Sequence, residues 1–167
     1  MLALATATTG LALSVAAQAQ SYPAQPVRML VGYAAGGGAD GIIRAIAPEL
    51  SETLGQTIVI DNRPGGGTVI ATQAVANSKA DGYTMYVMDH AFIVNPVIVG
   101  KLPYDSLRDF VPVGGISSSS TTLAVVHPSL PVKSVKELVA LARAKPGQLN
   151  YASGGNGTVP HIMGELF

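Results

Sequence analysis

The sequence predicts an α/β fold built on a mostly parallel sheet. Short apolar runs of strand length alternate with segments whose apolar residues recur at helical spacing, and glycine or proline turns separate them. Of the 167 residues, 48% are hydrophobic, which is enough for a core and excludes a disordered tail. The length is roughly that of one domain.

The first segment predicts targeting rather than folded structure. Residues 1–17 form an uncharged apolar run of signal-peptide length, and Ala17-Gln18-Ala19 is a small-x-small cleavage site. No charge occurs before Arg28, so the usual basic residues ahead of the apolar run are missing. Either the true start lies upstream or the peptide is atypical. We expect residues 1–19 to be a signal peptide that is cleaved near Ala19.

Strands and helices are expected to alternate from Val27 onward. Pro48 should kink or split the first helix, Gly55 should end it, and the turn residues that begin at Asp61 should end the second strand. Residues 91–109 look less regular. The predicted strands are 27–33, 57–60 and 83–88, and the predicted helices are 40–54 and 68–77.

The pattern changes from Val111 onward. Residues 111–116 and 122–127 are apolar β runs around a Ser/Thr tract, and such a pair could link two lobes. Ser134 and Glu137 form a capping box, which predicts a helix that runs to about residue 144. A short strand over 149–152 and a helix over 159–167 follow. No helix stop follows the last segment, so we expect the N-terminal part of a longer protein.

Composition excludes several classes of function. Ten Lys+Arg balance ten Asp+Glu, so no basic footprint for nucleic acid exists. The absence of Cys excludes disulfide scaffolds, thiolate metal sites and Cys nucleophiles. His90, His127 and His161 have no short metal-binding spacing. We therefore expect neither a metal nor a cofactor.

Two glycine-rich loops are the strongest candidates for a binding site. Each follows a predicted strand and opens a predicted helix, where free backbone N–H groups and the helix dipole favour an anion. The loops could face each other across a cleft, although a tight turn is the alternative for either loop alone. The first loop comprises Tyr33, Ala34, Ala35, Gly36, Gly37 and Gly38, and the second comprises Ser153, Gly154, Gly155, Asn156, Gly157 and Thr158.

Two hypotheses of enzymatic function compete with the hypothesis of a binding protein. The first is a dinucleotide-dependent oxidoreductase, because Gly36-x-Gly38-x-x-Gly41 matches the dinucleotide-binding pattern and Asp61 follows at a suitable distance. Gly41 would lie inside the helix, however, and two residues separate the strand from the first glycine. A hydrolase that uses Ser153 and His161 is the second hypothesis, although nothing in the sequence places these side chains together. His161, close to the second loop, is also a candidate ligand donor.

Several short motifs occur in register over residues 22–167. They are Tyr22-Pro23-Ala24-Gln25-Pro26-Val27-Arg28, Gly36-Gly37-Gly38-x-Asp40 with Arg44, Asn62-Arg63-Pro64-Gly65, Asp81-Gly82-Tyr83-Thr84, Lys101-Leu102-Pro103-Tyr104-Asp105, and Pro146-Gly147-x-Leu149-Asn150-Tyr151-Ala152-Ser153. In these motifs the sequence resembles the Bug-type receptors, the substrate-binding proteins of tripartite tricarboxylate transporters, whose members are longer than this chain.

The resemblance implies a periplasmic receptor of the type 2, Venus-flytrap kind. Residues 20–115 would belong to the first lobe, and 116–167 would begin the second. The lobes would hold a small carboxylate through main-chain amides and ordered water and deliver it to a membrane transporter. A monomer without catalytic residues is expected, and an inactive fragment is the remaining alternative. By analogy the ligand contacts fall on the first loop, on Asp89 and His90, and on the second loop with His161.

One departure from the family pattern concerns the loop after the third strand. Members of the family commonly offer Ser or Thr there, whereas this sequence offers Asp89. A carboxylate that faces a carboxylate ligand is unfavourable. The hypothesis is that the ligand carries an amide or a positive group at that end, or that Asp89 points away.

Overall fold

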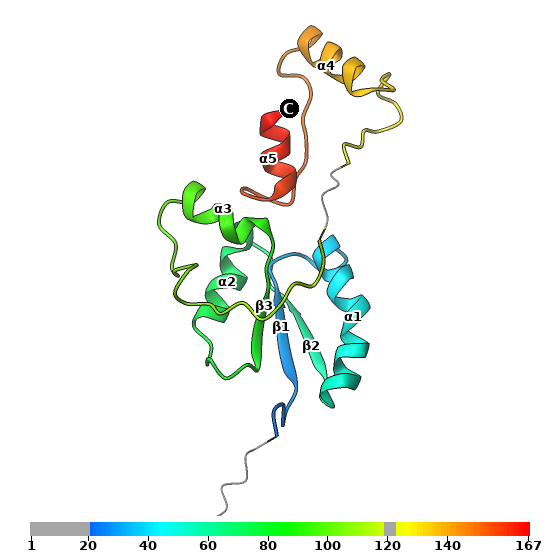
Figure 1. Ribbon diagram of the computed structural model, residues 1–167. Coiled ribbons are helices and arrows are strands. Elements are labelled where there is room, and N and C mark those ends of the chain that lie inside the picture. The colour runs from blue at the N-terminus through cyan, green and yellow to red at the C-terminus, as the bar shows by residue number, and fades with distance from the viewer. Residues whose placement is uncertain (1–20, 119–122) are drawn as a thin grey trace, which may run out of the picture.

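The computed structural model describes residues 21–118 and 123–167. The predicted signal peptide at 1–19 and part of the Ser/Thr tract lie outside these described residues. The predicted α/β architecture is confirmed (Figure 1). Three parallel strands form a sheet in the order β2–β1–β3. Their bounds are Val27–Val31 for β1, Ile58–Asn62 for β2 and Thr84–Val87 for β3.

The central strand β1 pairs with both neighbours. Val31 lies opposite Asn62 on one side and opposite Val87 on the other. The chain therefore leaves β1 toward β2 and later returns to the opposite side as β3. Where the direction of winding reverses in a parallel sheet, the loops at the carboxyl ends of the two strands separate and leave a crevice. This topology places a crevice between the ends of β1 and β3.

Helix α1, Gly38–Leu54, covers one face of the sheet. Ile43 and Ala47 are buried, and they pack with Val27 and Val31 of β1. The expected break at Pro48 is wrong, because the helix continues through it. Pro48 is exposed, so water can reach the carbonyl that loses its partner, while buried residues hold the preceding turns on the sheet.

The opposite face carries α2, Val69–Ala76, and α3, His90–Ile98, packs against α2. A short 3-10 turn, Gly66–Thr68, precedes α2. The side chain of Leu30 points to the face of the sheet opposite to that of its β1 neighbours, and Leu30 is 1% exposed. Helix α3 lies within the segment expected to be irregular. Asp89 caps its first turn, since the Asp89 side chain accepts a hydrogen bond from the Ala91 N–H.

Helices α4, Val135–Ala144, and α5, Val159–Leu166, lie beyond the carboxyl ends of the strands (Figure 1). Half of the predicted capping box at the start of α4 is confirmed, because Ser134 caps Glu137 while Glu137 bonds to the N–H of Lys133 instead of that of Ser134. The Ser134 hydroxyl accepts from the Glu137 N–H at 3.2 Å, and the Glu137 carboxylate accepts from the Lys133 N–H at 2.7 Å.

Several predicted strands are absent from the described residues. Residues 111–116, 123–127 and 149–152 form no strand. No described strand lies beside them to complete a hydrogen-bonded ladder. Val111 and Val125 are 86% and 85% exposed, so no apolar surface covers these side chains either. The second strand, by contrast, is longer than expected. Asp61 and Asn62 were expected to begin a turn, but they extend β2.

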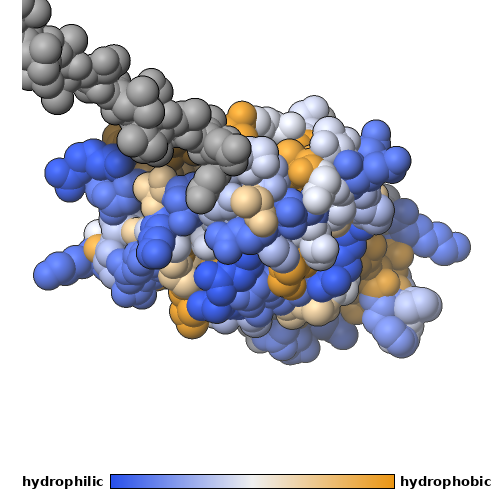
Figure 2. Space-filling model, turned by 90° about the horizontal axis from the view of Figure 1, so that it is seen from below, coloured by the Kyte–Doolittle hydropathy of each residue, from blue (hydrophilic) through white to orange (hydrophobic). Residues whose placement is uncertain are grey.

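The amino ends of the strands face a mostly hydrophilic surface with isolated hydrophobic residues, as Figure 2 shows from below. Among the described helices, none combines the length and apolar character needed to cross a bilayer.

Candidate functional site

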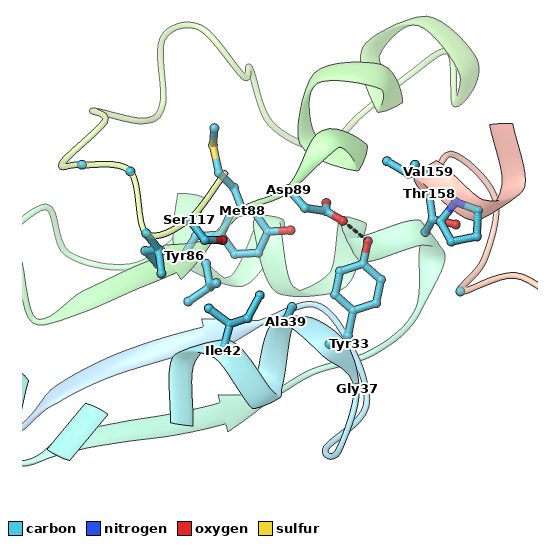
Figure 3. A pocket seen from close by; sticks show the side chains of 17 residues that line it. Tyr33, Gly37, Ala39, Ile42, Tyr86, Met88, Asp89, Ser117, Thr158 and Val159 are labelled. Atoms are coloured by element: carbon cyan, nitrogen blue, oxygen red, sulfur yellow. Dashed lines mark hydrogen bonds between the residues drawn. The ribbon is translucent and has the colours of Figure 1, made fainter. Parts of the chain in front are cut away.

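The register of the sheet brings Tyr33 and Asp89 together. Val31 of β1 pairs with Val87 of β3, and each of the two residues lies two positions farther along its own strand direction. Residues two apart on a strand point to the same side. The Tyr33 hydroxyl accordingly donates a hydrogen bond to Asp89 Oδ2 across the crevice (Figure 3).

A cleft of about 620 Å³ surrounds this pair. Its walls come from the loops after β1 and β3, the start of α1, the segment around Ile116 and the start of α5 (Figure 3). The lining residues that the sequence singled out are Tyr33, Gly37, Gly38, Asp89, Gly154 and Thr158.

The start of α1 offers backbone donors to this cleft. Gly38 and Ala39 both line it, and the first N–H groups of a helix have no intrahelical acceptor. No side chain caps α1 at Gly37. The helix dipole adds positive potential at the same point. This end of the cleft is therefore suited to a small anion.

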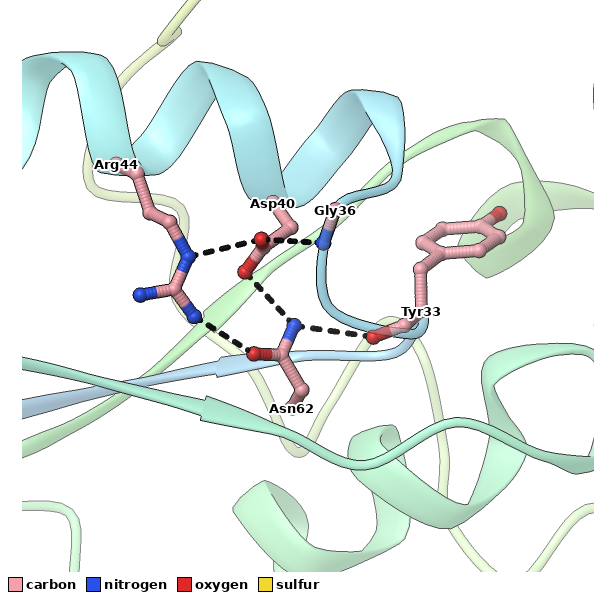
Figure 4. A network of polar contacts seen from close by, with 5 residues as sticks. All are labelled: Tyr33, Gly36, Asp40, Arg44 and Asn62. Carbon is pink, nitrogen blue, oxygen red and sulfur yellow. Dashed lines mark hydrogen bonds and ion pairs between the residues drawn. The ribbon is translucent and has the colours of Figure 1, made fainter.

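A polar network holds the first glycine loop in place (Figure 4). Asp40 is 1% exposed, and its carboxylate accepts from Gly36 N–H at 2.8 Å and from Arg44 Nε at 2.8 Å. The Asn62 amide nitrogen donates to Asp40 Oδ1 at 2.9 Å and to the Tyr33 carbonyl at 3.1 Å. The hydrogen bond from Arg44, with those from Gly36 and Asn62, keeps the pKa of Asp40 well below its ordinary value.

The second glycine loop packs directly against the first part of the chain. A Cβ atom on Gly154 would lie 3.5 Å from Tyr33 Cε1, so the two loops face each other as the sequence suggested. Gly157 has a φ of +81°, and a Cβ there would come within 2.7 Å of Asn95 Oδ1. Asn95 also donates to the Gly67 carbonyl at 2.8 Å. Helix α3 therefore contacts the second glycine loop and the 3-10 turn that precedes α2.

The other candidate residues lie outside the cleft. His161 and Asn156 line a smaller cavity of about 380 Å³ with Ile98. His161 Nδ1 accepts from the Gly157 N–H at 3.4 Å, so this histidine supports the second loop. The remaining candidates that do not line the main cleft are Ala34, Ala35, Gly36, His90, Ser153, Gly155 and Gly157.

Neither enzyme alternative gains support from the geometry. The Ser153 hydroxyl accepts from the Gly155 N–H, while His161 contacts Gly157, so each side chain bonds to its own loop. Gly41 lies inside α1, and Asp61 is engaged by Arg63 at 2.9 Å. Within residues 21–118 and 123–167, no group of acidic or histidine side chains could hold a metal.

Apolar lining residues were missed by the sequence analysis. Ile42 projects from α1, and Tyr86 and Met88 come from the end of β3 (Figure 3). Ile116 comes from the connecting segment. The adjacent pair Ile42-Ile43 puts one isoleucine beside the buried stripe of an amphipathic helix, and this is a sequence signal that could have been used. Position 116 carries no such signal, because only the path of the chain brings it to the cleft.

Comparisons with known proteins agree with this architecture. Residues 42–167 match the family described as "Tripartite tricarboxylate transporter family receptor". The chain is 37% identical over 163 residues to Protein BugT of Bordetella pertussis, covering 96% of this chain and 49% of that protein. The chain thus spans about half the length of the curated relatives it matches.

Solved structures are similar over most of this chain. The periplasmic binding protein BugD matches with a TM-score of 0.77 and 30% identity, covering 87% of this chain and 48% of that one. R. palustris Rpa4515, solved with adipate, matches with a TM-score of 0.75 and 35% identity, covering 87% and 48%.

Proposed function

The chain belongs to the tripartite tricarboxylate transporter receptor family, and from this premise we propose that it binds a small carboxylate in the cleft beside Tyr33. The observation that carries this proposal is the uncapped start of α1, whose Gly38 and Ala39 amides line the cleft. Backbone amides at a helix start bind carboxylates well. The adipate bound by Rpa4515 is a ligand of the same chemical class.

The proposal extends to a two-lobed exported receptor. Residues 20–115 form the first lobe in this proposal, and 116–167 begin the second. Support comes from the cleft itself, which is lined by Tyr33 and Asp89 from one segment and by Thr158 and Val159 from the other. A ligand held between them would draw the two segments together, and the closed surface would be presented to a membrane transporter in the periplasm.

Two substitutions at Gly38 distinguish the contribution of its N–H donor to ligand binding from the effect of added bulk in the loop. Gly37 has φ −74° and ψ 169°, which is compatible with a following proline, and a Cβ on Gly38 would meet nothing within 4 Å. Gly38→Pro removes one N–H donor while suiting the first turn of a helix. Gly38→Ala adds bulk and keeps the donor, and is the matched control.

Calorimetry on the protein expressed from its own gene would measure binding of hexanoate and of hexanamide. We expect hexanoate to bind and hexanamide not to bind. Gly38→Pro should weaken hexanoate binding about tenfold, the loss of one charge-assisted hydrogen bond, whereas Gly38→Ala should leave it unchanged. If hexanoate and hexanamide behave alike, the proposal of a carboxylate receptor is wrong.

A further inference from the structure

We propose that Tyr33 and Asp89 make one end of the cleft a hydrogen-bond acceptor, so that the ligand carries a donor there, preferably an ammonium, in addition to its carboxylate. This inference rests on the proposed function, because it takes the carboxylate to lie at the start of α1. The juxtaposition of Tyr33 with Asp89 carries it (Figure 3).

Both oxygens of Asp89 already accept hydrogen bonds from the protein. Oδ1 accepts from the Ala91 N–H at 3.0 Å, and Oδ2 accepts from the Tyr33 hydroxyl. Each carboxylate oxygen has a second lone pair, so each keeps one free acceptor position and has no proton to offer. Asp89 is half-buried and lines the cleft, and its negative charge therefore faces whatever binds there.

Tyr33 is converted into an acceptor by the same contact. A phenol has one proton, and here that proton points to Asp89. Burial, with the hydrogen bond and charge of Asp89, raises the pKa of Tyr33 far above its ordinary value. The Tyr33 hydroxyl therefore keeps its proton and donates it to Asp89, and its free lone pairs are what a ligand can reach.

Other polar groups do not restore a donor at this end. The Tyr86 ring lines the cleft, but its hydroxyl oxygen is buried and out of reach of a ligand. Ser117 lies on the far side of Met88 from Asp89 (Figure 3). The Ala91 N–H at the start of α3 is occupied by Asp89. The Thr158 hydroxyl donates to the Gly155 carbonyl at 2.7 Å. The polar side-chain atoms that the Tyr33–Asp89 pair presents to the cleft are thus acceptors.

The consequence for selectivity is a preference between ligands of matched length. A second carboxylate at this end would meet the charge of Asp89 and find the Tyr33 proton already engaged, while an ammonium would donate to Asp89 and Tyr33. We expect ε-aminocaproate to bind at least about tenfold more tightly than adipate, and γ-aminobutyrate more tightly than succinate.

Asp89→Asn tests the pair with little change of shape. The Asn oxygen can still cap α3 at Ala91, while its amide nitrogen donates to the Tyr33 oxygen and frees the phenol proton for the ligand. Asp81→Asn is the matched control. Asp81 makes the same bond to a residue two positions on, the Tyr83 N–H at 3.0 Å, and is exposed outside the cleft.

Calorimetry on the protein expressed from its own gene would measure its affinities for ε-aminocaproate and adipate, with hexanoate as a reference ligand. In support, Asp89→Asn should reduce the preference for ε-aminocaproate over adipate at least about tenfold, while Asp81→Asn leaves it unchanged. If hexanoate binds but the wild type shows no preference, or the preference survives Asp89→Asn, the inference is wrong and the proposed function stands. If no carboxylate binds, both fail.

Discussion

Asn62 is the residue on which the order of the first glycine loop depends most. It joins the end of β2 to Asp40 and to the Tyr33 carbonyl, and its side-chain oxygen accepts from Arg44 Nη2 at 3.0 Å (Figure 4). Asn62→Ala removes all three hydrogen bonds at once. The change should loosen the loop that carries Tyr33 into the cleft.

The expected cost follows from the environment of each bond. The bond to buried Asp40 is charge-assisted and contributes about 1.5 kcal/mol, and the bond to the Tyr33 carbonyl contributes about 1 kcal/mol. The Arg44 side chain is 51% exposed, so its bond contributes about 0.5 kcal/mol or less. The free energy of unfolding should fall by about 2–3 kcal/mol in total.

Urea unfolding followed by circular dichroism would measure this loss, and amide hydrogen exchange at Gly36 and Gly37 would locate it. Asn77→Ala is the control, because Asn77 is exposed at the end of α2 and its side chain makes no hydrogen bond to any other residue that the structure describes. A loss below about 0.5 kcal/mol, equal to that of an ordinary surface substitution, would refute the assigned role of the network. So would unchanged exchange at the loop.

Three further predictions concern stability. Leu30→Ala should lower the free energy of unfolding by about 2–5 kcal/mol in urea titration, since Leu30 is 1% exposed; a loss under about 1 kcal/mol would contradict the packing described. Gly157→Ala should cost more than Gly147→Ala, because both need positive φ but only the first meets Asn95, and equal losses would argue against that contact. Asp40 has a lowered pKa in the folded protein, so its stabilisation is complete above its ordinary pKa and is lost as pH falls; unfolding free energies measured from about pH 5 to pH 2 should decline less steeply in Asp40→Asn, and parallel curves would count against it.

Much of the first half of the fold could be predicted from local sequence. The strand near residues 27–31, the helix that ends at Gly55 and the capped helix after Ser134 each carry a complete local signal. Local signals failed where tertiary packing overrides them. Pro48 lies inside a continuous helix held on the sheet, and α3 forms through Pro96 because buried Ala91 and Phe92 secure its first turn.

The candidate site divides in the same way. Residue types alone indicated two glycine loops at helix starts, because a glycine-rich helix N-terminus exposes backbone N–H donors wherever it occurs. Sequence could not show that Gly154 lies beside Tyr33, or that His161 turns to Gly157 instead of the cleft. Those contacts join parts of the chain far apart in sequence or depend on which way a side chain turns.

By itself, the sequence determined the fold class, the family and the two glycine loops at helix starts, since these follow from periodicity, composition and short motifs. Only the tertiary structure decided the meaning of Asp89. The parallel register of β1 and β3 sets Asp89 opposite Tyr33, and the start of α3 gives it a second donor. A carboxylate that looked out of place beside an anion thereby becomes a bonded acceptor, because strand order and register, which no local pattern encodes, fix its neighbours.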